Sequence, residues 1–338
     1  MTFPDLVQPL IERKDLTEQQ AGLLMRHLMS GEATDAQIGA VLFGLRMKGC
    51  TTHELAAFIR VLREKATILD HEYEDLVDTC GTGGGSESFN ISTAAAIIAC
   101  SAGVRIAKHG NRAVTSKCGS ADVLEELGIP IRSEPEWLAH TLETSRIVFL
   151  FAQAHHPAMR FVGKARKELG MRTVFNQLGP LLNPARANRQ LIGVYDPGLM
   201  RSMGEALKVL GSERALIVHG KDGLDEISPV TPTEFVKVWD NKVTSGTLHL
   251  SDFGLKPIDP VALTPGNNVQ ENASILREAV NDIQSLRAQA VLPSAAAAIW
   301  ISGLEDRLPD AVARAKSAIE SGLATAKLNE LIQIGVSK

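Results

Sequence analysis

The sequence predicts an α/β protein with a small all-helical part and a large part built on a mostly parallel sheet flanked by helices. Residues 1 to about 70 combine helix start signals with helical spacing of apolar residues. From Leu76 onward, short apolar runs alternate with helical patterns, as βαβ units require. We therefore expect a helical domain at residues 1–70, joined by helices from about residues 155–185, and an α/β domain at residues 71–338.

Composition limits the classes of protein that fit. The chain has 338 residues, of which 44% are hydrophobic and 4% aromatic, so its core must consist mainly of Ala, Leu, Ile and Val. The net charge is −4, without a long run of one sign. This balance argues against nonspecific nucleic-acid binding by the whole surface, although a local basic cleft stays compatible with it.

The cysteines and the apolar runs indicate the compartment. Cys50, Cys80, Cys100 and Cys118 are too far apart for a CxxC metal or redox site. The N-terminus lacks the pattern of a signal peptide, and no apolar run approaches the roughly 20 residues that cross a bilayer. We expect a soluble cytoplasmic protein with reduced thiols.

Three early helices each begin with a capping box. The paired residues are Thr17 with Gln20, Thr34 with Gln37, and Thr51 with Glu54. Small residues on the second helix, Gly39, Ala40 and Gly44, would allow another helix to approach closely. The hypothesis that follows is a homodimer formed through the helical domain, and packing within one chain is the alternative.

Short apolar runs mark the strands of the expected sheet. They are Leu76–Asp78, Val104–Ala107, Ile147–Phe151, Leu191–Tyr195 and Ala215–His219. Two further runs, Phe235–Trp239 and Lys242–Thr244, are joined by Asp240-Asn241 and predict an antiparallel hairpin. Helices expected at Asn281–Ala290, Ser294–Ile301 and Ala311–Leu331 would cover one face of the sheet.

A glycine-rich loop follows the first strand. Gly81-Thr82-Gly83-Gly84-Gly85 contains four glycines in five residues, so its backbone can reach positive φ and lie close to a ligand. Asn90-Ile91-Ser92-Thr93 then places N-cap residue types before the apolar run that starts at Ala94. Free N–H groups at that helix start would face the loop, which is an arrangement that binds phosphate.

Further cations and hydroxyls come from the loop after the second strand. Lys108-His109-Gly110-Asn111-Arg112 is followed by Thr115, Ser116, Lys117 and Ser120. Ammonium, guanidinium and hydroxyl groups together suit an anion with more than one phosphate. The alternative is a flexible linker followed by a solvated basic loop, but the order of strand, glycine turn, polar helix start, strand and basic loop argues against it.

Two familiar phosphate motifs do not fit this stretch. A P-loop ends in Gly-Lys-Ser/Thr, whereas Ser86-Glu87 follow the glycines. The dinucleotide pattern counted from Gly81 requires glycine at position 86, which is serine. The sequence therefore predicts a phosphate site of another type.

An acidic turn follows the fifth strand. Asp225-Glu226 lies beyond a strand end, where open α/β sheets bind ligands, and its carboxylates suit Mg²⁺ shared with a substrate's phosphates. Taken alone, the pair could be an ordinary acidic turn. His155 and His156 could equally be structural, and Arg166 alone would be assigned to solvent.

Taken together, these motifs resemble the anthranilate phosphoribosyltransferase family. GTGG, FNIST, KHGNR, KCGSADVLEELG, HHPAM, FNQLGPLLNP and DGLDE occur in the family's order over nearly the whole chain. The resemblance implies the fold of nucleoside phosphorylases and phosphoribosyltransferases, a homodimer, and transfer of the phosphoribosyl group from phosphoribosyl diphosphate (PRPP) to anthranilate in tryptophan biosynthesis. It also implies Mg²⁺, with two ions expected.

The resemblance also implies roles for individual residues. PRPP would be bound by Gly81, Gly84, Gly85, Ser88, Asn90, Ile91, Ser92, Thr93, Lys108, His109, Gly110, Asn111, Arg112, Ala113, Val114, Thr115, Ser116 and Ser120. Anthranilate would be bound by Gly81, Asn111, His156 and Arg166, and the metal by Ser92, Asp225 and Glu226. No dedicated acid or base is expected, because an aromatic amine is already neutral at pH 7.

The chain departs from the family in the glycine loop. The family usually has aspartate after GTGG, where this chain has Gly85 in a loop that is one residue shorter. We expect activity with weaker PRPP binding. Two other functions compete with this reading: a pyrimidine-nucleoside phosphorylase, against which the acidic pair argues, and a nucleic-acid-binding branch of the fold, against which the charge balance argues.

Overall fold

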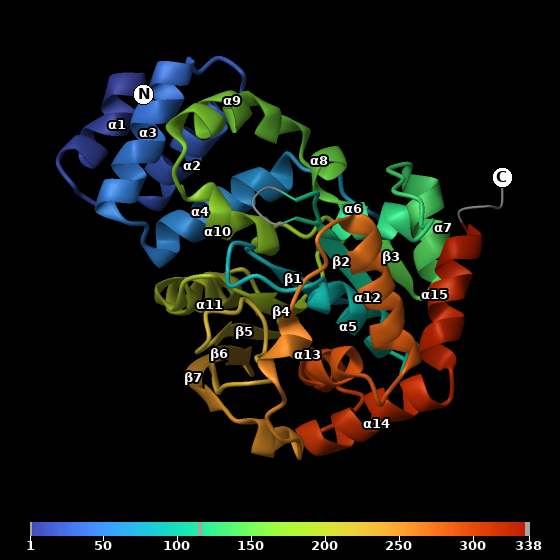
Figure 1. Ribbon diagram of the computed structural model, residues 1–338. Helices are drawn as coiled ribbons and strands as arrows, with labels where there is room; N and C mark the ends of the chain where they lie inside the picture. Colours follow the sequence, from blue (N-terminus) through green and yellow to red (C-terminus); the bar gives the residue numbers. More distant parts are fainter. Residues whose placement is uncertain (1, 114–116, 335–338) are drawn as a thin grey trace.

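The N-terminal helices begin where their capping boxes predict. The computed structural model describes residues 2–113 and 117–334 (Figure 1). Its first helices are α1 (Phe3–Ile11), α2 (Glu18–Leu28), α3 (Asp35–Lys48) and α4 (Thr52–Glu64). The boxes at Thr17, Thr34 and Thr51 are all formed, and before α1 the Thr2 N–H donates to the Asp5 carboxylate at 2.7 Å.

A seven-stranded sheet forms the centre of the larger part and confirms the predicted mostly parallel arrangement. Its order is β3-β2-β1-β4-β5-β6-β7. The strands are β1 (Val77–Gly81), β2 (Ile106–Gly110), β3 (Ile147–Phe151), β4 (Arg189–Gly193), β5 (Arg214–Gly220), β6 (Thr233–Trp239) and β7 (Lys242–Leu248). Strands β1 to β5 are parallel, and β6 and β7 add the predicted antiparallel hairpin. Asp240 and Asn241 both have positive φ, as a tight hairpin turn requires.

The two faces of the sheet bury different helices. Along β5, Leu216 and Val218 join one core and Ala215 and Ile217 the other, because successive side chains alternate between faces. The first core contains α5 (Ile91–Ser101), α12 (Val269–Asn281), α13 (Leu286–Ser302), α14 (Leu308–Glu320) and α15 (Leu323–Ile334). The second contains α11 (Met200–Val209) and the N-terminal helices (Figure 1).

The C-terminal helices cover one face as predicted, but their bounds differ from the prediction. Asn281 ends α12 instead of beginning a helix, and α13 begins after Ser285, whose hydroxyl accepts from the Ala288 N–H at 3.0 Å. The helix predicted at Ala311–Leu331 is divided at Gly322, which has φ of 77°. An N-cap serine and a left-handed glycine, both local signals, override the continuous apolar pattern.

The segment between β3 and β4 packs on the N-terminal helices. It contains α8 (Ala152–His155), α9 (Arg160–Leu169) and α10 (Phe175–Leu178), whereas α6 (Ser120–Glu126) and α7 (Pro135–Ser145) lie between β2 and β3. Helix α9 contacts α3, and Val162 and Phe175 share a core with Leu24 of α2. None of the helices in the described part of the chain is long and apolar enough to cross a membrane.

The strand order reverses between β1 and β4. From β1 the chain continues outward to β2 and β3, and then returns to place β4 on the other side of β1. Gly81 and Gly193 are register partners at the carboxyl ends of these two strands. Open α/β sheets bind ligands at such a reversal, so the glycine loop lies where the topology predicts a site.

Candidate active site

The glycine loop and the acidic loop are joined backbone to backbone. The N–H of Ser86 donates to the carbonyl oxygen of Gly223 at 2.8 Å, and the Ser86 hydroxyl donates to that of Asp222 at 2.8 Å. Gly223 has φ of 86°, and a Cβ there would lie 2.6 Å from the Ser86 hydroxyl. These contacts bring two loops together that are separated by more than a hundred residues of sequence.

Two further glycines let Asp225 reach the end of the sheet. A Cβ at Gly193 would overlap the carbonyl oxygen of Asp225. At Gly85, a Cβ would lie 2.7 Å from Oδ1 of Asp225 and 2.8 Å from its backbone nitrogen. Position 85 therefore has no room for the aspartate that is usual in the family. Glycine at this position lets the acidic loop pack directly against the glycine loop.

The start of α5 and Lys108 meet beside the glycine loop. Helix α5 begins at Ile91 as predicted, but the Asn90 side chain does not cap it and instead donates to the Cys118 carbonyl oxygen at 3.2 Å. The buried Lys108 ammonium donates to the Ser92 hydroxyl at 3.2 Å and to the carbonyl oxygen of Thr79. Lys108 thus lies at the positive end of α5, where an anion is favoured.

The acidic pair lies in the same place, and burial disfavours the charged form of both carboxyl groups. Burial, followed by repulsion from Asp225, raises the pKa of Glu226 to about 8, against the opposing influence of Lys108. Burial also raises the pKa of Asp225. The Ser294 hydroxyl of α13 donates to Oε2 of Glu226 at 3.4 Å. Two adjacent carboxylates with raised pKa favour a cation between them.

These donors fit Mg²⁺ that is shared with a substrate. Carboxylate and hydroxyl oxygens are the hard ligands that Mg²⁺ prefers. Within residues 2–113 and 117–334, no group of three or more His, Cys, Asp and Glu side chains is arranged to hold a metal. Asp225 and Glu226 offer two adjacent carboxylates for such an ion.

The basic loop after β2 is folded onto α6. The Ser120 hydroxyl donates to the Asn111 carbonyl oxygen at 3.2 Å, and Asp122 accepts from the Ala113 N–H at 2.9 Å. Arg112 is paired with Glu125 and, at 3.2 Å, with Asp122. Its charge is thus directed toward α6. The predicted site residues Val114, Thr115 and Ser116 lie outside the described residues.

His109 faces away from Lys108. The two residues are neighbours on β2, so their side chains project from opposite faces of the sheet. His109 lies with His156, at 5.3 Å between ring centroids in an edge-to-face arrangement. Burial lowers the pKa of His109 and, with repulsion from His155, lowers that of His156 to about 4. Both imidazoles are therefore neutral at pH 7.

Arg166 carries a charge without an acidic partner. Its guanidinium lies over the Phe175 ring at 5.1 Å, and burial lowers its pKa. In the described ranges no Asp or Glu pairs with it. No hydrogen bond there links it to Asn111 or His156 either. A half-buried, unpaired guanidinium fits a carboxylate ligand, which can accept two parallel N–H bonds.

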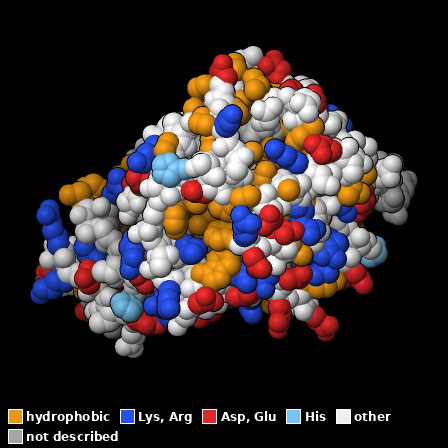
Figure 2. Space-filling model, turned by 90° about the horizontal axis from the view of Figure 1, so that it is seen from below, with side chains coloured by type: hydrophobic (Ala, Val, Ile, Leu, Met, Phe, Trp, Pro, Cys, Tyr) orange, Lys and Arg blue, Asp and Glu red, His pale blue; other side chains and the backbone are white. Residues whose placement is uncertain are grey.

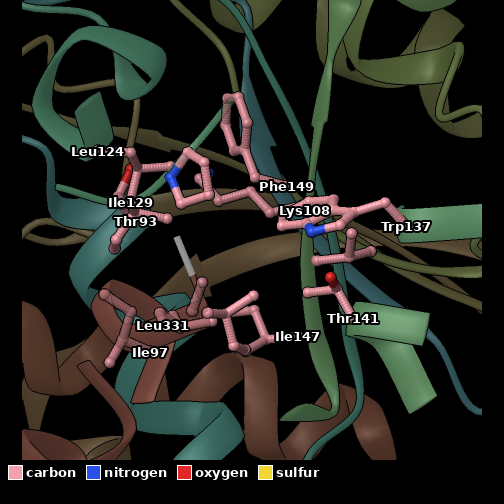
Figure 3. A pocket seen from close by; sticks show the side chains of 14 residues that line it. Thr93, Ile97, Lys108, Leu124, Ile129, Trp137, Thr141, Ile147, Phe149 and Leu331 are labelled. Carbon is pink, nitrogen blue, oxygen red and sulfur yellow. The ribbon is translucent and has the colours of Figure 1, made fainter. Parts of the chain in front are cut away.

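A cavity lies behind the helix start, between α5, α7, α15 and the β2–β3 edge (Figure 3). Thr93 and the stem of Lys108 form part of its wall, and the other labelled side chains, among them Trp137, Ile147 and Leu331, are mostly apolar. The Thr93 hydroxyl is buried and has no hydrogen-bond partner in the described structure. This lining suits a hydrophobic interior and not a diphosphate.

Sequence reasoning missed three residues of this region. Gly193 could have been found, because a glycine at the end of β4 opposite Gly81 is a signal for close backbone approach. Ser294, which donates to Glu226, and Arg172, which donates to Gly84, could not have been found, because each is far along the chain from its partner. The Ser88 hydroxyl, which was predicted to bind PRPP, donates to the Phe89 carbonyl oxygen at 3.3 Å.

Two family models match the chain, one in each of its two parts. The family model described as "Glycosyl transferase family, helical bundle domain" matches residues 4–66. The model described as "Glycosyl transferase family, a/b domain" matches residues 73–325. Together with the switch-point site, these matches define a two-part glycosyl transferase.

Relatives and solved structures identify the particular family. Anthranilate phosphoribosyltransferase of Methanocorpusculum labreanum is 46% identical, with coverage of 99% of this chain and 98% of the relative. That of Methanosphaerula palustris is 47% identical, with coverage of 96% of each chain. The Thermus thermophilus structure has a TM-score of 0.92 at 38% identity, covering 98% of this chain and 100% of the other. The chain belongs to the anthranilate phosphoribosyltransferase family.

A further solved relative carries ligands. The Saccharomyces cerevisiae enzyme "in complex with PRPP and Mg" has a TM-score of 0.84 at 27% identity, covering 95% of this chain and 93% of the other. The fold predicted from the sequence is therefore confirmed, and the family predicted from its motifs is confirmed as well.

Substitution of Gly85 tests the fit between the two loops. We expect Gly85→Ala and Gly85→Asp both to raise the PRPP KM, because any Cβ at this position collides with Asp225 and Gly223. Gly85→Ala measures the steric part alone. Steady-state kinetics on both variants would contradict this account if Gly85→Asp bound PRPP more tightly than the unsubstituted protein.

Proposed function

We infer that this protein transfers the 5-phosphoribosyl group from PRPP to the amine of anthranilate, giving N-(5-phosphoribosyl)anthranilate and diphosphate in tryptophan biosynthesis. The observation that carries this proposal is the meeting of the glycine loop, Ser92, Lys108 and the pair Asp225-Glu226 at the switch point of the sheet.

Transfer of the phosphoribosyl group requires stabilisation of the departing diphosphate, which these donors and cations can provide. Diphosphate leaves C1 of the ribose while positive charge builds on the sugar ring, so stabilising the departing anion is the main task. Lys108, with its ammonium fixed by Thr79 and Ser92, is oriented before substrate arrives. The amine of anthranilate is neutral at pH 7, and the chain needs no dedicated base to activate it.

Mg²⁺ is the cofactor that we propose, supported by the yeast relative solved with PRPP and Mg. Ser92, Asp225 and Glu226 are its proposed ligands, with two ions expected. Bound Mg²⁺ supplies neutralisation of the diphosphate charge. The raised pKa of Glu226 supports this assignment, because a cation would stabilise the charged form of a carboxyl that burial disfavours.

The proposed substrate contacts follow the motif residues that this chain shares with the family. Backbone N–H groups of the glycine loop and of the start of α5 would hold the diphosphate, with Asn111 and Ser120 near the ribose. Arg166 would bind the carboxylate of anthranilate, and the neutral His156 would lie against its ring. His109 accompanies His156, so we now place it on the anthranilate side instead of with PRPP.

One assay tests the proposed reaction. Anthranilate fluorescence should fall when PRPP is added in the presence of Mg²⁺, and should stay constant when the metal is chelated with EDTA. Thymidine phosphorolysis without metal would instead support the phosphorylase alternative. Fluorescence that stays constant under every condition, with the protein folded, would reject the transferase proposal.

Arg166→Ala should separate the two substrates. We expect the anthranilate KM to rise roughly ten- to a hundredfold, because one charged hydrogen bond contributes about 1.5–3 kcal/mol. The PRPP KM should change far less. Lys164→Ala, two residues earlier on the exposed side of α9, is the matched control. Equal increases in both KM values would show that Arg166 does not bind anthranilate.

The homodimer remains a proposal, and an exposed apolar stripe on α3 supports it. Ala36, Ala40, Phe43 and Met47 follow one another at helical spacing, and Phe43 and Met47 are 53% and 54% exposed. Gly44 does not belong to this surface, because it packs against Leu10 of α1. A dimer should appear in light scattering at micromolar concentration and dissociate in Phe43→Asp, whereas a monomeric unsubstituted protein would exclude it.

The surface charge bears on the proposed partners. Figure 2 shows Lys and Arg side chains mixed with Asp and Glu on the visible face, which supports the proposal that nucleic acid is not a partner. We also propose a cytoplasmic location without a membrane partner.

The proposed domain boundary near residue 70 is supported by the two family models. One of them ends at residue 66 and the other begins at residue 73.

A further inference from the structure

Arg172 connects the segment after α9 to the tip of the glycine loop. It follows Gly170, whose φ of 59° ends the helix in a left-handed turn. One guanidinium nitrogen, Nη2, donates to the carbonyl oxygen of Gly84 at 2.8 Å. The same guanidinium lies over the ring of Tyr195, with 3.7 Å between Cζ and the ring centroid. Arg172 therefore has a fixed position although its side chain is at the surface.

The tip of the glycine loop needs such an anchor. Its two ends are tied down, at Thr82 by the Gly193 carbonyl oxygen and at Ser86 by that of Gly223. Between them, Gly83 and Gly84 have φ of 66° and 81°, and glycine loses more conformational freedom on ordering than any other residue. The bond from Arg172 holds the part of the loop that would otherwise be the most mobile.

Tyr195 ties this anchor to the same loop from the other side. Its backbone N–H donates to the Thr82 hydroxyl at 3.1 Å, and its ring supports the guanidinium of Arg172. Arg172 therefore contacts both the loop tip, at Gly84, and the residue that holds the start of the loop, Tyr195.

We propose that Arg172 is a positioning residue for PRPP: by holding the Gly84 carbonyl oxygen against the Tyr195 face, it fixes the glycine loop in the conformation that receives the diphosphate. The proposal rests on the transferase function proposed above. Arg172 lies six residues after Arg166 on the same segment, yet it serves the opposite substrate. The two arginines are therefore distinguishable by which KM they affect.

Two substitutions at Arg172 test the proposal. Arg172→Ala should raise the PRPP KM roughly ten- to a hundredfold, the loss expected for one charged hydrogen bond, and leave the anthranilate KM much less changed. Arg172→Lys should recover only part of the loss, because an ammonium keeps the charge but cannot both stack on the ring and reach the carbonyl. Arg160→Ala is the control, since Arg160 lies over Phe161 on the same segment and away from the loop.

Substitutions of Tyr195 separate positioning from direct binding of the substrate. Tyr195→Phe keeps the ring and should leave the PRPP KM close to its original value, whereas Tyr195→Leu removes the ring and should raise it. In the double variant Arg172→Ala with Tyr195→Leu, the two effects should not add, because both act through one contact. Full additivity would overturn the shared role.

Several results would overturn the proposal. A PRPP KM unchanged in Arg172→Ala, complete recovery in Arg172→Lys, or a matching effect of Arg160→Ala would each do so. Equal increases in both KM values with a lowered unfolding temperature would show a general structural role instead. Failure of the proposed function is a separate outcome, because it would appear as inactivity of the unsubstituted protein with PRPP and anthranilate.

Discussion

The site depends on close backbone packing between the glycine loop and the acidic loop at the end of the sheet, which only residues without a side chain allow. At Gly193 and Gly85, side chains would overlap Asp225, and at Gly223 one would meet Ser86. Because these positions have no Cβ, the acidic loop after β5 can lie directly on the glycine loop after β1. Carboxylates and phosphate-binding N–H groups thereby share one location, although neither segment contains both.

Ionisable groups are concentrated in that location before any ligand arrives, and burial disfavours their charged forms. Burial lowers the pKa of Lys108 and raises that of Glu226, and their mutual attraction opposes both effects. Groups held in a partly dehydrated site interact more strongly with an incoming charge than they would in water. A diphosphate with its metal would provide the missing partners on both sides: the anion for Lys108, and the cation for Asp225 and Glu226. Preorganised charge of this kind stabilises a departing anion without further rearrangement.

Apolar periodicity and capping residues predicted most of the secondary structure. The prediction failed where a cap interrupts a continuous apolar pattern. The strand predicted at Val104–Ala107 overlaps β2 only at Ile106 and Ala107, whereas the one predicted at Ala215–His219 lies within β5. The helix predicted at Asn281–Ala290 was given too early a start, because the apolar pattern continues over a break that Ser285 defines by capping α13. Among the site residues, Lys108, Ser92 and the acidic pair converge as their motifs suggested. The pairing of Arg112 with Glu125 was not predictable from the sequence. The opposite directions of Lys108 and His109 were missed because the predicted strand ended at Ala107, whereas β2 extends to Gly110.

The sequence by itself determined the periodicity of the strands, the capped starts of the helices, the glycine loop and the family, because each is written in residues close together along the chain. Only the tertiary structure decided that Gly85 leaves no space for a side chain and that Arg172 reaches Gly84 across 88 positions of sequence. The reason is physical: steric exclusion and hydrogen bonding act over a few ångströms in space, and distant segments acquire those distances only when the sheet and its helices have packed.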